Sequence, residues 1–390
     1  MTGVQTCALP IYPNPTPQDR DNLPPNVFEN LDQAMAALKP GDQLLIRGSG
    51  VLEVPTLSRI TKPDFNVTIR PEDEKISVIL TPSETKRLDS AMFWLEEGRI
   101  RFERIEFRLK PKIAKSEEMK SQAIVALAGG RGCEFHKCVI TMDQRKSEIL
   151  TAVALVDLSA EMSKSEVTRK PVIRMEDCLL RGRGRAVWAA STFPFDFNAS
   201  NVFFALDAPL VELDAPAKSP PSGAVVRIDL TRVTAWLGAG LIELRCGKAL
   251  GDKSGPFVPV SVRTEGCLLG VVPGNVSPFA LITGGDSTLW DRYVTWDVET
   301  ASGYGNFPES TIMLEISTND YEGKTKRVDI ENWLQFTKNK PSTFGKVTWK
   351  QSPELRSDLI AVLPDDATVK SSTFAKGIGC RVLDLPTSTR

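Results

Sequence analysis

The chain has 390 residues, of which 41% are hydrophobic and 25% charged, a composition typical of soluble globular proteins. Its 48 lysines and arginines nearly balance its 49 aspartates and glutamates, which argues against nucleic acid or an anionic membrane surface as the main partner. No apolar run reaches the roughly 18–20 residues of a transmembrane helix, so we expect no membrane segment in this chain.

Residues 1–12 do not read as part of the folded protein. MTGVQTCALPI has no basic residue and only a short apolar run interrupted by Pro10, so it is not a signal peptide. Pro10 and Pro13 would each remove a ladder hydrogen bond from a strand. All eleven residues are similar to the translation of a common short-read sequencing adapter. The resemblance implies an artefact, in which Cys7 is not native and the natural protein extends further upstream.

The next segments predict a linker, a helix and a first strand. Residues 13–25 carry five prolines and predict an extended linker. Apolar residues recur at helical spacing over 27–38, which predicts a short amphipathic helix that ends at Lys39-Pro40-Gly41. Leu44-Leu45-Ile46 then predicts a strand.

From there one eight-residue pattern returns along the chain. Written with Φ for an apolar position, it is Φ-x-Φ-x-x-Φ-x-Φ. It predicts two short strands, each with every second side chain inward, joined by a corner that shifts the inward parity by one residue. ERI, HKC, EDC and TRV place their polar residues at that corner. Irregular spacing between the copies suits stacked repeats with loops of varied length. The copies begin at residues 100, 133, 173, 197, 228 and 262.

The cysteines support the stacking and argue against a metal centre. Without Cys7, six remain, and Cys138, Cys178 and Cys267 occupy the same position of the pattern, where they would form an inward ladder. The chain has no CxxC and a single histidine, His136, so we expect no metal and no cofactor. His136 itself is expected to be a solvated corner residue.

Several stretches resemble a known family. VFENLDQAMAALKPGDQLLIRGSGVLEV is similar to the opening of right-handed parallel β-helix proteins of the pectin lyase-like superfamily. MEDCLLRGRGRAVWAAS, LTRVTAWLGAGLIELR and VPVSVRTEGCLLG resemble rungs of a bacterial β-helix group that often lies C-terminal to a serine/threonine kinase domain. The resemblance implies an all-β fold, a right-handed parallel β-helix (solenoid) over 26–285 with an N-terminal capping helix. Residues 286–390 are expected to form a C-terminal cap or small appended module.

Two groups of residues are candidates for ligand binding. Asp177 and Arg181 could form an acid–base pair, and the RGRGR stretch, with Arg183 and Arg185, could grip a carboxylate or phosphate. The alternative for these four is ordinary surface charge. Trp290, Tyr293 and Trp296 could form an exposed platform for sugars, or else the core of a capping element.

The sequence favours a binding function over catalysis. The G-H-G and W-x-D-H stretches of the family's lyases and hydrolases are absent, as are the HRD and DFG motifs of kinases. We therefore expect a non-catalytic scaffold with a protein or polysaccharide partner, the C-terminal part of a longer bacterial protein that carries the kinase upstream. The alternative is a polysaccharide lyase, a glycosidase or a carbohydrate-binding module on the same fold. Bacterial cytoplasm and cell envelope both stay open as locations.

Overall fold

The structure is a computed structural model. It describes residues 8–11, 27–28, 30–55, 58–61, 65–84, 89–111, 120–143, 149–156, 170–216, 220, 222–246, 257–272, 277–284, 290–299, 302–317, 325–337, 344–352, 356–374 and 377–387. The linker expected at 13–25 lies outside the described residues.

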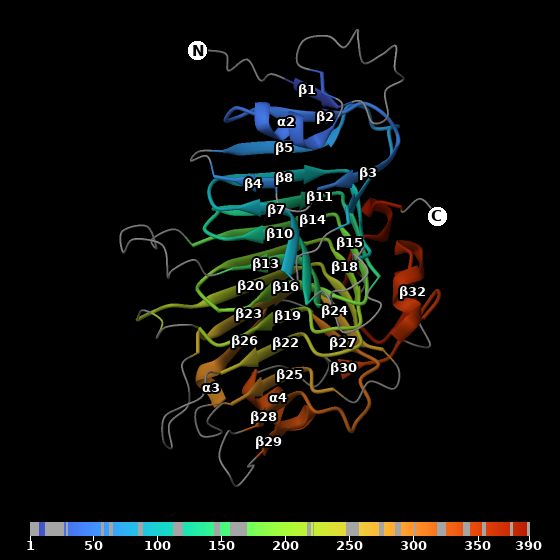
Figure 1. Cartoon of the computed structure of the whole chain (residues 1–390). Coiled ribbons are helices and arrows are strands. Elements are labelled where there is room, and N and C mark those ends of the chain that lie inside the picture. Colours follow the sequence, from blue (N-terminus) through green and yellow to red (C-terminus); the bar gives the residue numbers. More distant parts are fainter. Residues whose placement is uncertain are drawn as a thin grey trace, which may run out of the picture.

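Three ten-stranded sheets run along the molecule, and from β2 to β28 consecutive strands fall in different sheets (Figure 1). Sheet A contains β1 (Ala8–Ile11), β2 (Gln43–Ile46), β5 (Asn66–Pro71), β8 (Arg99–Glu103), β11 (Gly132–His136), β14 (Val172–Glu176), β17 (Asp196–Ser200), β20 (Val226–Thr231), β23 (Val260–Glu265) and β26 (Val294–Glu299). Sheet B contains β3 (Gly50–Val54), β6 (Val78–Pro82), β9 (Glu106–Leu109), β12 (Val139–Met142), β15 (Leu179–Gly182), β18 (Phe203–Leu206), β21 (Thr234–Leu237), β24 (Leu268–Val271), β27 (Gly303–Gly305) and β30 (Phe344–Gly345).

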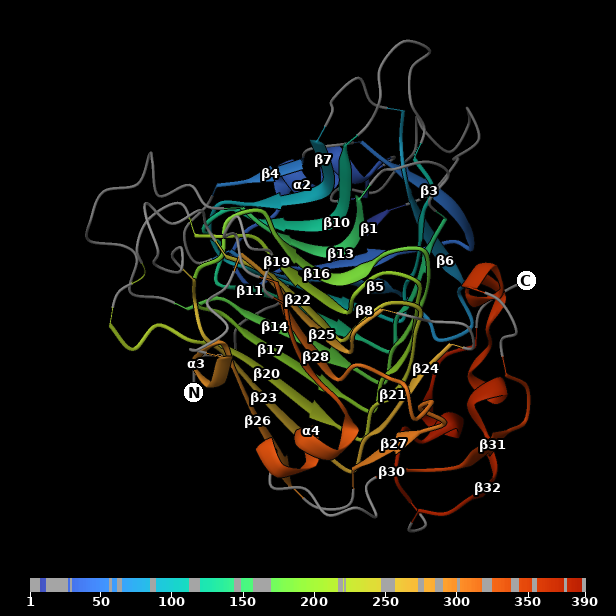
Figure 2. The same ribbon diagram turned by 90° about the horizontal axis from the view of Figure 1, so that it is seen from below.

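Sheet C completes each turn of the coil. It contains β4 (Ser58–Ile60), β7 (Asp89–Leu95), β10 (Ser121–Leu127), β13 (Ile149–Leu155), β16 (Arg185–Ala189), β19 (Val211–Leu213), β22 (Ile242–Arg245), β25 (Ala280–Thr283), β28 (Leu314–Ser317) and β29 (Thr325–Val328). All pairings in the three ladders are parallel except that of β28 with β29. The protein is therefore an all-β parallel β-helix, as the sequence predicts, and Figure 2 views it from the end at which α4 lies.

The repeated pattern marks the junction between sheets A and B in six coils. Its first positions are direct neighbours along sheet A, in the order Ile100, Cys133, Ile173, Phe197, Ile228 and Val262. This stacking confirms the register that the pattern predicts. Because each inward position of one coil lies over the same position of the next, the buried side chains form continuous columns.

At each of these junctions one residue has a left-handed backbone conformation. The φ angles of this corner column lie between 51° and 59°, which Gly adopts freely and other residues only at a cost. A single residue in this conformation turns the chain from one sheet into the next and shifts the inward parity. The column consists of Arg104, Lys137, Asp177, Asn201, Arg232 and Gly266.

A substitution pair at Gly266 tests this account of the corner. A Cβ there would meet only Arg232 Cγ at 3.6 Å, so any cost is conformational rather than steric. We expect Gly266→Val to lower the free energy of unfolding by about 1–2 kcal/mol, because valine disfavours positive φ. Gly266→Asn should cost less than half of that, since Asn tolerates this conformation. Urea unfolding of both variants measures the difference, and equal costs would contradict the account.

The cysteines of the repeated pattern lie inside the coil, whereas Cys380 belongs to the C-terminal segment. Cys138, Cys178 and Cys267 are 0% exposed and share one column with Ile105, Val202 and Val233, which confirms the inward ladder. All six cysteines of the described residues are free thiols. Burial raises the pKa of Cys267 to about 11 and that of Cys246 to about 12. Thiols in this state are poor nucleophiles at neutral pH, so they serve as small apolar side chains.

The raised thiol pKa values predict a loss of stability at alkaline pH. An unfolded cysteine ionises at about pH 8.5, whereas the folded Cys267 thiol stays protonated until about pH 11. The contribution of Cys267 is therefore complete below about pH 8.5 and is lost as the pH rises towards 11, by roughly 3 kcal/mol in all. Urea unfolding between pH 7.5 and 10.5 measures this loss, which Cys267→Val should reduce. Equal losses in both proteins would exclude the thiol as a cause.

Both ends of the coil carry a helix. α2 (Leu31–Ala37) lies at the N-terminal end near β1 and β2, and Asn30 caps it by accepting a hydrogen bond from the Gln33 backbone N–H at 2.9 Å (Figure 1). The helix thus begins later than the expected range of 27–38. At the other end α4 (Ile330–Phe336) places Trp333, 0% exposed, 5.2 Å from Trp296 between ring centroids. These helices cover the apolar columns at the open ends.

Two details differ from the sequence expectations. Ala8–Ile11 forms β1, which pairs with β2 in parallel, whereas prolines had argued against a strand in this stretch. Pro10 is compatible with β1 because this strand is the edge of sheet A. The ladders also continue past residue 285, through β26, β27 and β28, before the chain reaches α4. α3 (Trp290–Tyr293) precedes β26.

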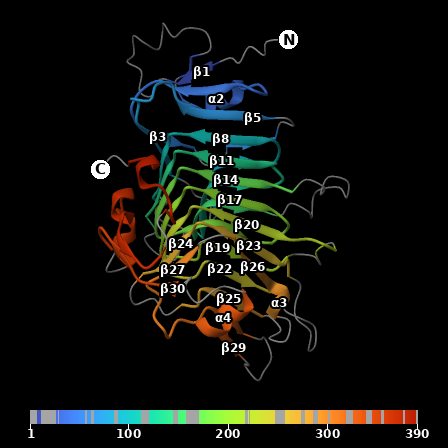
Figure 3. The same ribbon diagram turned by 180° about the vertical axis from the view of Figure 1, so that it is seen from behind.

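The segment after α4 folds back over the outer face of sheet B (Figures 1 and 3). It contains the antiparallel pair β31 (Val347–Trp349) and β32 (Val369–Ser372) and three 3-10 helices, η3 (Arg356–Ala361), η4 (Pro364–Ala367) and η5 (Val382–Asp384). We call residues 346–387 the clasp. Its apolar side chains bury the outward side chains of sheet B in a second core, made of Val139, Leu179, Phe203, Ala205, Trp236, Leu268, Val272, Val347, Trp349, Leu359, Val362, Ala367 and Leu385.

Candidate functional site

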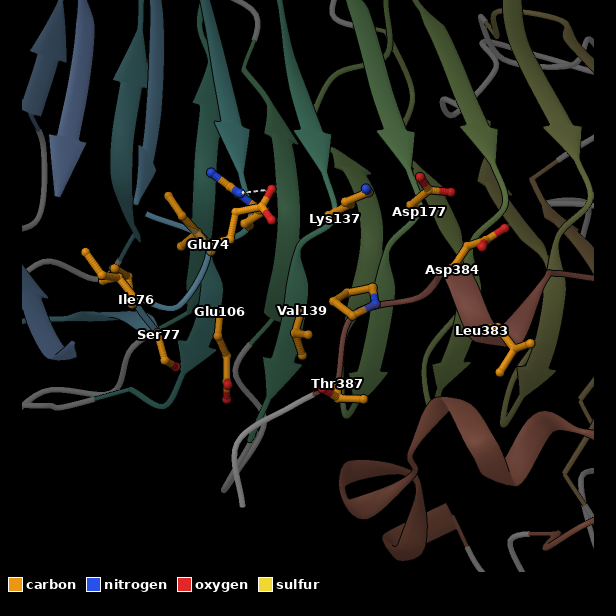
Figure 4. A pocket seen from close by; sticks show the side chains of 14 residues that line it. Glu74, Ile76, Ser77, Glu106, Lys137, Val139, Asp177, Leu383, Asp384 and Thr387 are labelled. Carbon is orange, nitrogen blue, oxygen red and sulfur yellow. Dashed lines mark hydrogen bonds and ion pairs between the residues drawn. The ribbon is translucent and has the colours of Figure 1, made fainter. Parts of the chain in front are cut away.

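A groove of about 640 Å³ runs between the corner column and the end of the clasp (Figure 4). One wall is formed by the corners of four successive coils, and the other by the clasp from Leu383 onward. Leu383 is 98% exposed and stands at the rim. The lining side chains are those of Glu74, Ile76, Ser77, Val78, Arg104, Ile105, Glu106, Lys137, Val139, Asp177, Leu383, Asp384, Pro386 and Thr387.

Hydrogen bonds fix the clasp along the corner column. The backbone N–H of Gly379 donates to the Gly266 carbonyl at 2.7 Å, and that of Cys380 to Thr234 Oγ1 at 2.9 Å. The backbone N–H of Arg381 donates to Asn201 Oδ1 at 2.6 Å. Each successive bond lies one coil nearer the N-terminal end, so the clasp runs back along the stack and defines the direction of the groove.

The groove is acidic on balance and has no aromatic lining among the described residues. Four carboxylates line it, those of Glu74, Glu106, Asp177 and Asp384, against two cationic side chains. Glu74 pairs with Arg104 at 2.7 Å, as the dashed line in Figure 4 marks. A negative field of this kind favours a cationic ligand, whereas sugar recognition commonly uses exposed aromatic rings.

The Glu106 carboxylate at the base of the groove is held by an arginine. It is 7% exposed and pairs with Arg108 at 2.6 Å. This ion pair fixes the position of the Glu106 carboxylate in the groove.

The structure separates the predicted pair of Asp177 and Arg181. Asp177 lies at the corner and accepts a hydrogen bond from Asn201 Nδ2 at 2.6 Å. Arg181 is 8% exposed beneath the clasp, where it donates to Thr141 Oγ1 at 3.0 Å and to the Val362 carbonyl at 2.8 Å. Burial lowers the pKa of Arg181. Arg181 thus fastens the clasp to sheet B, and these contacts give no support to an acid–base pair with Asp177, which stays a prediction.

The other arginines of RGRGR point to different places. Arg183 is exposed, whereas Arg185 lies on the outer face of sheet C and pairs with Glu212. The three arginines of this stretch therefore do not converge on one anion. Arg181 and Arg185 lie on different sheets, since β15 belongs to sheet B and β16 to sheet C, and Arg183 lies in the turn between these strands.

The expected aromatic platform is not exposed. Tyr293 is 0% exposed and packs on Phe257 at 4.3 Å between ring centroids. Trp296 is 4% exposed and packs on Phe279 at 5.5 Å. Trp290 lies in α3, and its side chain is outside the described set. Tyr293 and Trp296 belong to the core of the last coils, so an exposed sugar platform containing them is wrong.

A second cluster of charges lies on the outer face of sheet C. Glu212 is 0% exposed and pairs with Arg185 and, at 2.9 Å, with Arg245. Arg245 also pairs with Asp214 at 3.0 Å and with Glu243 at 2.9 Å. Partial burial opposes the charge on Arg245, but the three carboxylates together raise its pKa. Each carboxylate of the cluster is thus held by a guanidinium.

Sequence reasoning missed the groove because its walls come from distant parts of the chain. The corner residues were visible in the pattern, yet nothing in the sequence indicates that residues 383–387 return to them.

No protein-family model, curated protein or solved structure matches this chain. The parallel β-helix therefore stands on the strand ladders alone, and a fold of this kind does not define an activity. Within the described residues, no helix is long and apolar enough to cross a membrane.

Proposed function

We propose that this protein is a non-catalytic β-helix scaffold that binds an extended, cationic segment of a partner protein. The observation that carries the proposal is the acidic groove between the corner column and the clasp. Its walls follow the coil axis, so a ligand lying in it would contact several coils in succession. The rigid ladders below hold the groove charges in fixed positions before binding, which lowers the entropic cost of association.

The charge arrangement supports binding rather than catalysis. Glycosidases of this kind need one carboxyl group that donates a proton and a second that acts as base or nucleophile. In the groove Glu74 and Glu106 each pair with an arginine, and the sheet C cluster pairs its carboxylates in the same way. Each of these carboxylates therefore has a guanidinium partner, an arrangement typical of structural ion pairs.

The resemblance to rungs of the pectin lyase-like superfamily supports a finer proposal about context. We propose that this domain belongs with the bacterial β-helices that accompany serine/threonine kinases and presents a bound segment beside such a kinase. A protein segment, rather than a polysaccharide, fits the absence of aromatic rings from the described groove lining.

Selection from random displayed dodecapeptides on the full chain tests the proposal. We expect enrichment of lysine- and arginine-rich peptides, and at least about tenfold weaker binding by the variant Glu74→Lys plus Asp384→Lys, as expected when an attractive charge is reversed. Asp297→Lys, on the exposed outer face of sheet A, is the matched control and should bind normally. Peptides without a basic bias, or equal binding by the groove variant, would overturn the proposal.

The enzymatic alternative makes the opposite prediction in one assay. A panel of uronate-containing and neutral polysaccharides is incubated with the protein, and new reducing ends and unsaturated products are measured. The scaffold should release neither. Turnover that disappears in Glu243→Gln would instead identify the sheet C cluster as an active site.

A further inference from the structure

The single histidine of the chain lies beside a carboxylate of the next coil. His136 ends β11 and Glu176 ends β14, and the ladder register makes them direct partners. His136 Nδ1 lies 3.5 Å from Glu176 Oε2. Asp177 follows Glu176 at the left-handed corner, so its side chain leaves the chain next to the same pair.

The three side chains have the spacing of metal ligands. One ligand atom from each of His136, Glu176 and Asp177 lies within 4.8 Å of the other two. Two donors about 2.1 Å from a tetrahedral ion are about 3.4 Å apart, which is close to the His136–Glu176 distance. Imidazole nitrogen with two carboxylate oxygens is a donor set that suits Zn²⁺, and the two negative charges balance the ion.

Two further observations distinguish this cluster from ordinary surface charge. His136 Nδ1 is buried and makes no hydrogen bond to another described residue, although it faces Glu176. Asn201, 4% exposed, donates to Asp177 Oδ1 at 2.6 Å and is itself held by the Arg381 N–H. An outer partner that orients a ligating carboxylate is the usual companion of a metal ligand.

The corner column adds a comparison within the molecule. Arg104, Lys137 and Arg232 are basic at the equivalent positions, and Asp177 is the one acidic residue of the six. The acid occurs where the neighbouring strand ends carry His136 and Glu176. The side chains of His136, Glu176 and Asp177 therefore lie together at one point on the groove wall.

We propose that His136, Glu176 and Asp177 bind a divalent transition-metal ion of the zinc type, with water completing the tetrahedron. The ion links the coil of β11 to the coil of β14 and fixes the wall of the groove at Asp177. The proposal stands on the cluster itself and holds whether or not the groove binds a peptide.

Calorimetric titration of the tag-free full chain with ZnCl2 tests the site. We expect one ion per chain and a rise in melting temperature with added Zn²⁺. His136→Ala should weaken binding by about 10- to 100-fold or more, and Glu176→Gln should weaken it too. Glu265→Gln is the matched control, because Glu265 ends β23 in the same column but has Thr231 and Glu299 as neighbours. This variant should bind as the wild type does.

Three results would overturn the proposal. They are no binding below about 1 mM, binding that His136→Ala leaves unchanged, and Ca²⁺ binding as tight as that of Zn²⁺, which would indicate acidic groups alone. Equal melting temperatures of metal-free wild type and His136→Ala establish that the variant folds. If it does not fold, Glu176→Gln and the visible absorption of bound Co²⁺ decide the question. The variant Glu74→Lys plus Asp384→Lys should still bind Zn²⁺, which separates this site from peptide binding.

Discussion

Trp236→Ala is expected to release the clasp from sheet B while the coil stays folded. Trp236 is 3% exposed on the outer face of β21, where its ring packs 4.9 Å from Phe203 and 5.2 Å from Trp349 between centroids. Truncating a buried tryptophan costs roughly 3–5 kcal/mol, because both the apolar burial and the packing around it are lost. That loss falls on the contact between clasp and sheet, whereas the inward columns of the coil are untouched.

Limited proteolysis and hydrogen exchange measure the release. We expect new cleavage within residues 346–387 and faster exchange there, with unchanged exchange in sheets A and C. Trp349→Ala removes the same contact from the other side and should behave alike, whereas Val369→Ala, at a partly exposed position, should have little effect. Unfolding of the whole chain in one transition, without an exposed clasp, would contradict the division into coil and clasp.

Release of the clasp also removes one wall of the groove. Leu383, Asp384 and Pro386 line that wall, and the bonds from Gly379 and Arg381 that hold it are near the clasp end. Trp236→Ala should therefore abolish selection of cationic peptides, although no groove residue has been changed. Zn²⁺ binding by His136 and Glu176 should persist, since both residues belong to the coil.

The coil could be predicted from sequence because its corner has a fixed length. One left-handed residue, such as Lys137 or Asp177, joins two strands whose inward side chains alternate. Each such coil therefore repeats the same eight-residue pattern of apolar positions. The coil of β5 and β6 escaped this pattern because residues 72–77 make a longer connection between them. Where the connection between the two strands is longer, the eight-residue pattern is lost although the strand ladders continue.

The site could not be predicted because it depends on contacts between distant segments. Asp177 was identified as a candidate, but its neighbours in the groove include Asp384, more than 200 positions away in the chain. Arginine is a residue type that often binds anionic ligands. Only the hydrogen bond from Arg181 to the Val362 carbonyl shows that Arg181 holds the clasp instead. His136 was assigned to solvent because its partner, Glu176, is set by the ladder register rather than by local spacing.

Glu212→Gln is expected to destabilise the protein by roughly 3–5 kcal/mol, the cost typical of removing one partner from a buried ion pair. Glu212 is 0% exposed and balances Arg185, whose side chain is 15% exposed, together with Arg245. Glutamine keeps the shape but leaves the buried guanidinium without its counter-charge. The effect should appear as a lower midpoint of urea unfolding, with an unchanged dependence on urea concentration.

The matched controls separate the buried charge from the rest of the cluster. Glu243→Gln changes a more exposed carboxylate that shares Arg245, and it should cost less than about 1 kcal/mol. Arg185→Met combined with Glu212→Met removes both charges and should recover most of the stability, because two apolar side chains need no counter-charge. If Glu212→Gln were as stable as the wild type, the cluster would not be a structural ion pair.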